Sequence, residues 1–126
     1  MARYVRLIEG SSTAPDTVTR VRAAIEGRQR VLVVLDSMHT HAHVLDELRL
    51  YSPLVTKGSY LVVFDTCIEQ LPEALYPQRP WRHGDNPWTA VHEFVKTSNR
   101  FEIDKSIPNK LQITVAPDGF LKCIGD

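Results

Sequence analysis

The chain has 126 residues, of which 43% are hydrophobic, which suits one small folded domain, or part of a larger one, and excludes a disordered chain. Fifteen basic side chains balance fifteen acidic ones, so the charge gives no electrostatic basis for binding nucleic acid or an anionic membrane surface. The longest apolar runs are strand-sized, which excludes a membrane-spanning segment, and Cys67 and Cys123 form no CxxC pair, so we expect a reduced, cytoplasmic compartment.

The first predicted elements are a strand and a helix. Residues 4–8 alternate polar and apolar side chains, which is the period of a strand, and the Gly-Ser-Ser turn at residues 10–12 ends it. Thr13 and Asp16 have the spacing of a capping box, which predicts the start of a helix. This helix has three aliphatic residues at helical spacing: Val18, Val21 and Ile25. Gly27 is suited to end it.

Two aliphatic runs, residues 31–35 and 60–64, predict buried strands. Neither run alternates with polar residues, which is typical of parallel strands that are covered on both faces. Between them, residues 40–51 predict a helix of crossover length, so we expect the two strands to be adjacent and parallel. One face of this helix is apolar: Val44, Leu45, Leu48 and Tyr51.

A long irregular segment follows at residues 69–85 and is rich in proline. Long loops in compact domains often act as lids or binding loops. Trp81 and Trp88 flank His83 and Asp85 at the end of this segment. They indicate a lid or a substrate wall; the alternative is an ordinary loop held by aromatic anchors.

The last elements are a helix and a group of strands. Asn86 and Pro87 predict the N-cap and the first turn of the helix. Its inward residues are Ala90, Val91, Phe94 and Val95. Residues 101–107, 111–115 and 120–124 predict strands. The alternation of strands and helices predicts a parallel α/β sheet, with the paired strands at the end as a variation on it.

Carboxylates follow both aliphatic runs, at Asp36 and Asp65. In open α/β sheets ligands bind beyond the carboxyl ends of the strands, so we expect these two side chains to converge in one crevice. Paired carboxylates suit a hard cation such as Mg²⁺. The alternative is that each aspartate only caps the helix that follows it.

Three histidines, His39, His41 and His43, come shortly after Asp36. His39 and His43 are four residues apart and would share a helix face, a spacing that can hold a transition metal. A solvated helix start is equally compatible with the pattern, and no HExxH motif supports zinc. We favour a histidine that accepts a proton or contacts the substrate near Asp36.

Residues 31–66, VLVVLDSMHTHAHVLDELRLYSPLVTKGSYLVVFDT, resemble the cephalosporin hydroxylase family, and the LDSMHTHAHV stretch is the most specific part. Further matches extend over nearly the whole chain: RLIEGSS, YPQRPW, DNPWTAVHEF and FEIDKSIPNKLQITVAPDGFLK. Members of this family have the fold of S-adenosylmethionine-dependent methyltransferases, and their relatives include rhamnosyl O-methyltransferases. The resemblance implies a Rossmann-like class I methyltransferase sheet in three layers, α/β/α. It also implies Mg²⁺-assisted methyl transfer to a hydroxyl of a small molecule, such as a sugar or a secondary metabolite.

The resemblance also implies roles for particular residues. Asp36 and Asp65 match the family's Mg²⁺ ligands, but Phe64 stands where the family has a further acid. The implied cofactor contacts are Gly10, Ser11, Ser12 and Asp36. The implied proton acceptor is His39 or His41.

The match covers only the C-terminal half of the family's domain. In the family, two strands and a glycine-rich turn come before the segment that matches residues 4–8, whereas the six glycines here are scattered and form no GxGxxG. We therefore interpret residues 1–126 as the C-terminal part of a single domain, with residues 69–85 as a lid-like loop. The missing strands should leave residues 31–35 at an open edge, so we expect a homo-oligomer and weak S-adenosylmethionine binding.

One other function is compatible with this pattern, and a third lacks support. A truncated, non-catalytic remnant of the family that self-associates or binds a partner would account for the missing loop and for Phe64. A hydroxylase, as the family name suggests, would need two histidines and one carboxylate on a different fold.

Overall fold

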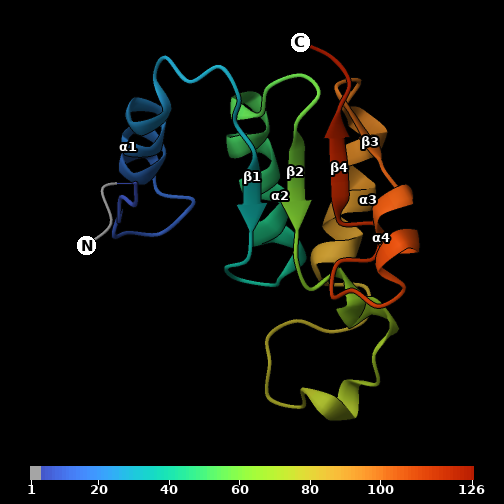
Figure 1. Ribbon diagram of the computed structural model, residues 1–126. Helices are drawn as coiled ribbons and strands as arrows, with labels where there is room; N and C mark the ends of the chain where they lie inside the picture. The colour runs from blue at the N-terminus through green and yellow to red at the C-terminus, as the bar shows by residue number, and fades with distance from the viewer. Residues whose placement is uncertain (1–3) are drawn as a thin grey trace.

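The computed structural model describes residues 4–126, which form a mixed sheet with helices beside it (Figure 1). The α-helices of these residues are α1 (Pro15–Ile25), α2 (His41–Tyr51), α3 (Pro87–Thr97) and α4 (Ser106–Leu111). The strands are β1 (Val33–Leu35), β2 (Tyr60–Val63), β3 (Phe101–Ile103) and β4 (Phe120–Cys123). Short 3₁₀ helices lie in the connections: η1 (Ser52–Leu54), η2 (Thr66–Gln70) and η3 (Glu73–Leu75).

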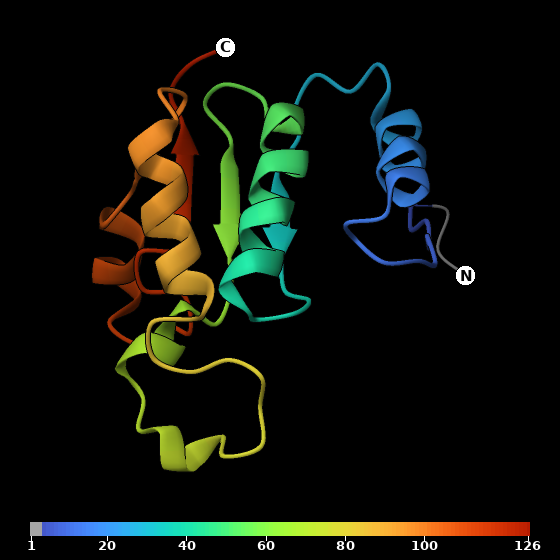
Figure 2. The ribbon, with the colours of Figure 1, turned by 180° about the vertical axis from the view of Figure 1, so that it is seen from behind.

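The strand order is β1-β2-β4-β3, with β1 parallel to β2 and β4 antiparallel to both of its neighbours. The predicted parallel pairing of the two aliphatic runs is confirmed, since Val33 pairs with Leu61 and Leu35 with Val63. Helix α2 connects these two strands, and α2 and α3 lie side by side on one face of the sheet (Figure 2). The chain is therefore an α/β protein, as the alternation of its elements predicts.

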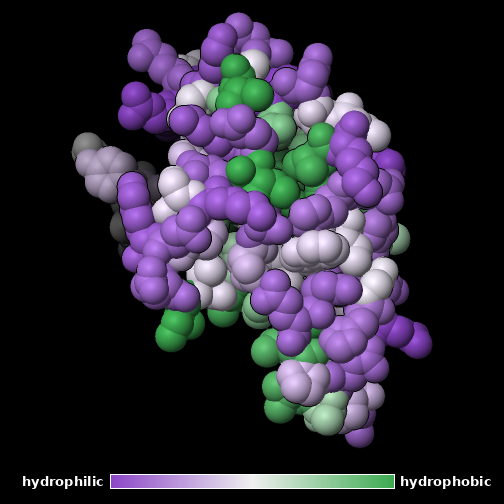
Figure 3. Space-filling view, turned by 90° about the vertical axis from the view of Figure 1, so that its right-hand side faces the viewer, coloured by the Kyte–Doolittle hydropathy of each residue, from purple (hydrophilic) through white to green (hydrophobic). Residues whose placement is uncertain are grey.

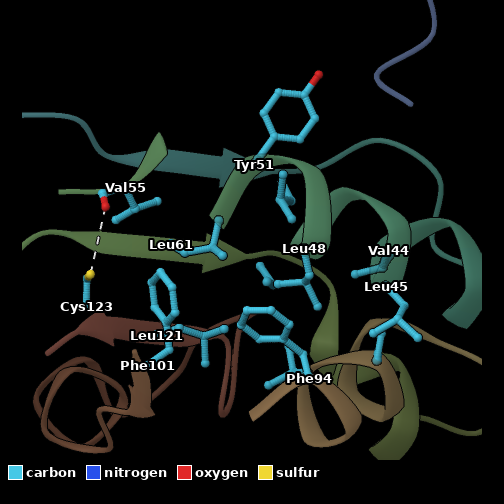
Figure 4. Packing of buried hydrophobic residues seen from close by; sticks show 14 of the residues in the cluster. Val44, Leu45, Leu48, Tyr51, Val55, Leu61, Phe94, Phe101, Leu121 and Cys123 are labelled. Carbon is cyan, nitrogen blue, oxygen red and sulfur yellow. Dashed lines mark hydrogen bonds between the residues drawn. The ribbon is translucent and has the colours of Figure 1, made fainter. Parts of the chain in front are cut away.

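The core lies between the sheet and the α2–α3 pair (Figure 4). Leu48 of α2, Leu61 of β2 and Leu121 of β4 are completely buried. Phe94 of α3 packs near Phe101 of β3, with 5.8 Å between the ring centroids. Full burial of one such side chain contributes on the order of 1.5–3 kcal/mol, so this cluster supplies much of the stability of the fold.

The start of α3 is fixed by its N-cap, Asn86. Its buried side chain accepts hydrogen bonds from the backbone N–H groups of Trp88 and Thr89, at 3.0 and 3.4 Å, and Thr89 Oγ1 accepts one from the backbone N–H of Asn86. Asn86 Nδ2 also donates to the carboxylate of Glu69. The predicted cap is confirmed. Through Asn86, both ends of the loop at residues 69–85 are held at the start of α3.

Strand β1 is half open to solvent. Within the described part of the chain it pairs only with β2, and Val34 is 49% exposed. The expected open edge is confirmed. The prediction that both faces of this run are buried is wrong, because burial depends on neighbouring elements and only one side of β1 has them. Helix α1 lies on this side of the molecule, away from α3, and reaches the core through Val18 (Figure 1).

The opposite face of β1 and β2 has no helix against it among residues 4–126 (Figure 1). Around these strands the described chain therefore has two layers and not the three that the family resemblance implies. On the side of β3 and α4 the surface is mainly hydrophilic, with hydrophobic side chains in separate groups (Figure 3). None of the described helices is long and apolar enough to cross a membrane.

Two predictions for the N-terminal segment are wrong. Residues 4–8 lie outside any strand, because the four strands pair with one another and none pairs with this segment. Helix α1 has Ala14 as its N-cap, without a side-chain hydrogen bond, so Thr13 and Asp16 form no capping box. The helix itself is confirmed, and Gly27, at φ 76°, follows its end as predicted.

The C-terminal tail contains fewer strand residues than predicted. Strand β3 ends at Ile103, and α4 follows it, with Pro108 in the first turn, where its missing N–H is tolerated. Residues 111–115 form no strand, and Ile113 is 91% exposed, because β4 already has a partner on each side. The predicted last strand is confirmed as β4.

Candidate functional site

The structure brings Asp36 and Asp65 together at one edge of the sheet. Asp36 directly follows β1, and Asp65 follows β2 by two residues, so the parallel pairing places both at the same end of the strands. The ligand atoms of Asp36, His39 and Asp65 all lie within 4.8 Å of one another. We call these three residues the Asp-His-Asp cluster.

The two carboxylates do not cap helices. Thr40 is the N-cap residue of α2, so Asp36 lies outside that helix start. Asp65 is the N-cap residue of η2, but its side chain makes no capping hydrogen bond. Its backbone has φ 57° and ψ 22°, a left-handed conformation that is uncommon outside glycine, asparagine and aspartate. The alternative of simple helix capping is therefore wrong for both aspartates.

His39 is the one of the three neighbouring histidines that reaches the carboxylates. Its Nε2 lies 3.2 Å from Asp65 Oδ2, and its side chain is largely buried. The ring of Trp81 meets the His39 ring edge-on, with 4.7 Å between the centroids. Trp81 belongs to the segment at residues 69–85, which lies beyond the carboxyl ends of β1 and β2 (Figure 1), so this loop contacts the cluster through the Trp81 ring.

His41 points elsewhere and links α2 to α3. Its Nδ1 lies 2.7 Å from Thr89 Oγ1 and its Nε2 lies 3.0 Å from Glu93 Oε2. Its backbone N–H donates to Asp85 Oδ1 at 2.8 Å. Of the two predicted proton acceptors, the structure places only His39 beside the two aspartates.

Ser12 lies in a cavity that Asp36 also lines. A cavity of about 340 Å³ is lined by Ser12 and Asp36, together with β1, Ser37, Glu47 and Tyr51. The backbone oxygen of Ser12 accepts a hydrogen bond from the Tyr51 hydroxyl at 2.6 Å. Burial, and secondly the charge of Glu47, raises the pKa of Tyr51, which keeps this hydroxyl a donor.

The two remaining predicted cofactor contacts lie outside this cavity. Ser11 is exposed, and its hydroxyl lies 3.2 Å from Thr13 Oγ1. Gly10 has φ 146°, and a side chain there would overlap the Thr17 hydroxyl, so glycine is required for the turn. Among the four predicted cofactor contacts, the structure thus brings Ser12 and Asp36 together and leaves Gly10 and Ser11 apart.

Glu47 is a charged residue of this region that sequence reasoning missed. It is 2% exposed, and its Oε1 accepts a hydrogen bond from Ser37 at 2.7 Å. Its Oε2 has no hydrogen-bond partner among residues 4–126. The sequence signal that could have found Glu47 was its position three residues after Val44, within the apolar face of α2. A buried carboxylate oxygen without a donor is costly, and Glu47 also lines this cavity, so a group that enters the cavity can donate to it.

Comparisons with known proteins show the family of the chain. The family model described as Rhamnosyl O-methyltransferase/CmcI matches residues 1–124. The chain belongs to this family. A rhamnosyl O-methyltransferase of Mycobacterium tuberculosis (strain ATCC 25618 / H37Rv) is 34% identical over 119 residues, which are 93% of this chain and 46% of the relative.

Other relatives give the same result. The rhamnosyl O-methyltransferase of Mycobacterium leprae (strain TN) is 33% identical over 119 residues, which are 93% of this chain and 49% of the relative. The chain therefore spans about half the length of the curated relatives that it matches. No solved structure matches the chain significantly.

Proposed function

We propose that this chain forms the metal and acceptor side of a methyltransferase site. In this site, the methyl group of S-adenosylmethionine passes to a hydroxyl of a small molecule, with a rhamnosyl group as the first acceptor to test. The observation on which the proposal rests is the convergence of Asp36 and Asp65 at the carboxyl end of two parallel strands, in a chain of this family. The proposal places residues 1–126 in the C-terminal half of a Rossmann-like class I methyltransferase domain.

The residues of the cluster fit a divalent cation. Asp36 and Asp65 offer the carboxylate oxygens that Mg²⁺ prefers, whereas His39 offers a nitrogen, which Mg²⁺ does not favour. A bound divalent cation would polarise the acceptor hydroxyl and lower its pKa. The two aspartates would also fix the acceptor in one orientation, which raises the rate by proximity.

The other side chains would bind and orient. Ser12 and Asp36 line one cavity, so we propose that they contact the cofactor, with Gly10 and Ser11 shaping the turn. The loop at residues 69–85 would act as a lid, with Trp81 excluding water from the cluster. Both cysteines are free, in keeping with the reduced, cytoplasmic compartment that we propose.

Proton transfer from the acceptor is assigned to His39 in preference to His41. His39 lies beside both aspartates, whereas both ring nitrogens of His41 are engaged by α3. His39 Nε2 can take up a proton or bind a cation, but not both at once. Metal-binding titrations of the wild type and of His39 variants separate these two roles.

A methyl-transfer assay tests the proposed function. The folded chain is incubated with a rhamnoside, a divalent cation and labelled S-adenosylmethionine at millimolar concentration, because we expect the cofactor to bind weakly. Label in the rhamnoside, lost with chelator and in the Asp36→Ala variant, supports the proposal. The absence of label at every cofactor concentration, with the protein folded, contradicts it and favours a non-catalytic chain.

Self-association is the second candidate function. Strand β1 has an open edge with Val34 half exposed, and the buried Glu47 Oε2 lacks a donor among the described residues. A strand from a second copy that pairs with β1 would cover the edge and could supply that donor. Sedimentation of the wild type and of Val34→Lys tests this: we expect a dimer that the lysine dissociates. A monomer at all concentrations contradicts it.

A further inference from the structure

We propose that His39 is the third protein ligand of the cation, in a site that prefers a first-row transition-metal ion, such as Mn²⁺ or Co²⁺, to Mg²⁺. This inference rests on the proposed function for the presence of a cation at this edge of the sheet, and it replaces the proton-acceptor role of His39. It adds the identity of the third donor and the class of the metal. The ligand set is Asp36, His39 and Asp65.

The spacing of the donors is that of neighbouring metal ligands. His39 Nε2 and Asp65 Oδ2 are 3.2 Å apart. Two adjacent ligands of one ion at about 2.0–2.1 Å lie roughly 3.0 Å apart in octahedral and roughly 3.4 Å apart in tetrahedral geometry. The carboxylate of Asp36 completes a triangle whose atoms all lie within 4.8 Å of one another.

The chemistry of the donors decides the preferred metal. Phe64 supplies no oxygen at the position before Asp65, so the third donor available at the cluster is the imidazole nitrogen of His39. Mg²⁺ takes oxygen ligands almost exclusively, whereas imidazole nitrogen suits transition metals. A set of two oxygens and one nitrogen therefore favours the transition-metal ions. Three protein ligands also leave positions open for water or an acceptor oxygen.

A second arrangement of the same residues needs no metal. A protonated His39 between two carboxylates would balance part of their charge through the contact to Asp65. His92 makes the same kind of pair, since its Nε2 lies 3.0 Å from Asp118 Oδ2. Among the residues described, no second carboxylate joins that pair to form a three-donor cluster. This second pair provides a matched control for ordinary histidine–aspartate contacts.

Trp81 is a built-in reporter for the site because its ring lies 4.7 Å from that of His39. The only other tryptophan is Trp88, which stacks on His92 with 3.8 Å between the centroids. The Trp88→Phe background therefore leaves one fluorophore beside the cluster. Mn²⁺ and Co²⁺ quench a neighbouring indole, and Mg²⁺ is measured by its competition against Mn²⁺.

The titration compares ions and variants without cofactor or acceptor. In the Trp88→Phe background we expect saturable quenching by Mn²⁺ and Co²⁺, with dissociation constants at least about tenfold below that of Mg²⁺. Adding His39→Ala or His39→Gln should weaken Mn²⁺ binding by roughly tenfold or more and change Mg²⁺ binding by less than about threefold. His92→Ala should leave the binding of every ion unchanged. Circular dichroism of each variant shows that it is folded.

Three outcomes overturn the inference. They are equal affinity for Mg²⁺ and Mn²⁺, unchanged Mn²⁺ affinity in both folded His39 variants, and an equal loss of affinity in His92→Ala. The result is independent of the methyl-transfer assay. A chain that binds Mn²⁺ through His39 but transfers no methyl group contradicts only the proposed function. Transfer that persists with Mg²⁺ in a His39 variant of unchanged Mn²⁺ affinity contradicts this inference and the proton-acceptor role of His39, but not methyl transfer itself.

Discussion

Two halves of the sheet differ in how completely the chain covers them. The closed half consists of β2, β4 and β3 with α3 against them, and in it Val63 is 1% exposed. The open half consists of β1 and α1, and in it Val34 is 49% exposed. Val62, the cross-strand neighbour of Val34 on the same face of the sheet, is 6% exposed and belongs to a similar aliphatic run. The difference between these two residues shows that neighbouring strands and helices, and not the local sequence, set the burial of a strand.

The Asp-His-Asp cluster joins the two halves. Asp36 follows the strand of the open half, Asp65 follows a strand of the closed half, and His39 lies in the connection between them. An ion bound there would hold the halves together and stabilise the folded chain by mass action.

The largest effect is expected for matched valine substitutions. Val63→Ala removes two methyl groups from a closed core and should lower the free energy of unfolding by about 2–3 kcal/mol. Val34→Ala makes the same change at the open edge and should change it by less than about 0.5 kcal/mol. Urea denaturation measures both. Equal losses would show that the two halves are covered alike.

The second effect concerns two helix N-caps. Asn86→Ala removes the buried cap of α3 and should cost about 1–2 kcal/mol in unfolding free energy, because two backbone N–H groups lose their acceptor. Thr40, the N-cap residue of α2, makes no side-chain cap. Thr40→Ala should therefore cost less than about 0.5 kcal/mol. The idea fails if thermal unfolding shows the reverse order.

The third effect is a gain of metal binding at Phe64, which is half-buried directly after β2. Phe64→Glu adds a carboxylate next to Asp65 and should tighten Mg²⁺ binding by about tenfold, or about 1.4 kcal/mol. Calorimetry gives the affinity and the melting temperature gives the stability. Unchanged affinity with a large drop in stability would mean that this position does not belong to the site.

The smallest effect is a pH dependence in the closed half. Hydrogen bonds from Ser106 and Tyr60 lower the pKa of Asp104 to about 2. A carboxyl with a depressed folded pKa stabilises the protein above its unfolded pKa of about 3.9 and loses that contribution as pH falls through the folded value. Asp104→Asn should therefore lower the urea midpoint at pH 5, and its effect should become smaller as the pH falls toward 2. A difference that is constant over this range would contradict the assignment.

The fold was predictable from sequence where local signals and tertiary neighbours agree. The aliphatic run of β2, the apolar face of α2 and the cap at Asn86 all specify elements that the structure contains. Residues 4–8 and 111–115 alternate like strands but form none, because alternation supplies a buried face and no pairing partner. Which strands pair with one another depends on the whole sheet, and the local sequence pattern carries no information about it.

The site was predictable only in part, for a related reason. The rule that ligands bind at the ends of parallel strands was enough to place Asp36 and Asp65 together. The direction of each histidine around the start of α2 depends on packing against α3 and against the loop at residues 69–85. Sequence spacing predicted a histidine near Asp36 but could not choose between His39 and His41, whereas the structure brings His39 to the aspartates.

We propose that this chain holds the cation side of a methyltransferase site and by itself binds S-adenosylmethionine only weakly. Calorimetric titration with S-adenosylmethionine, with and without a saturating divalent cation, tests it most directly. We predict a dissociation constant in the range of about 1 mM or weaker in both cases, together with clear binding of the cation itself. A monomer that binds S-adenosylmethionine with a micromolar dissociation constant, or that binds no divalent cation, would contradict the claim.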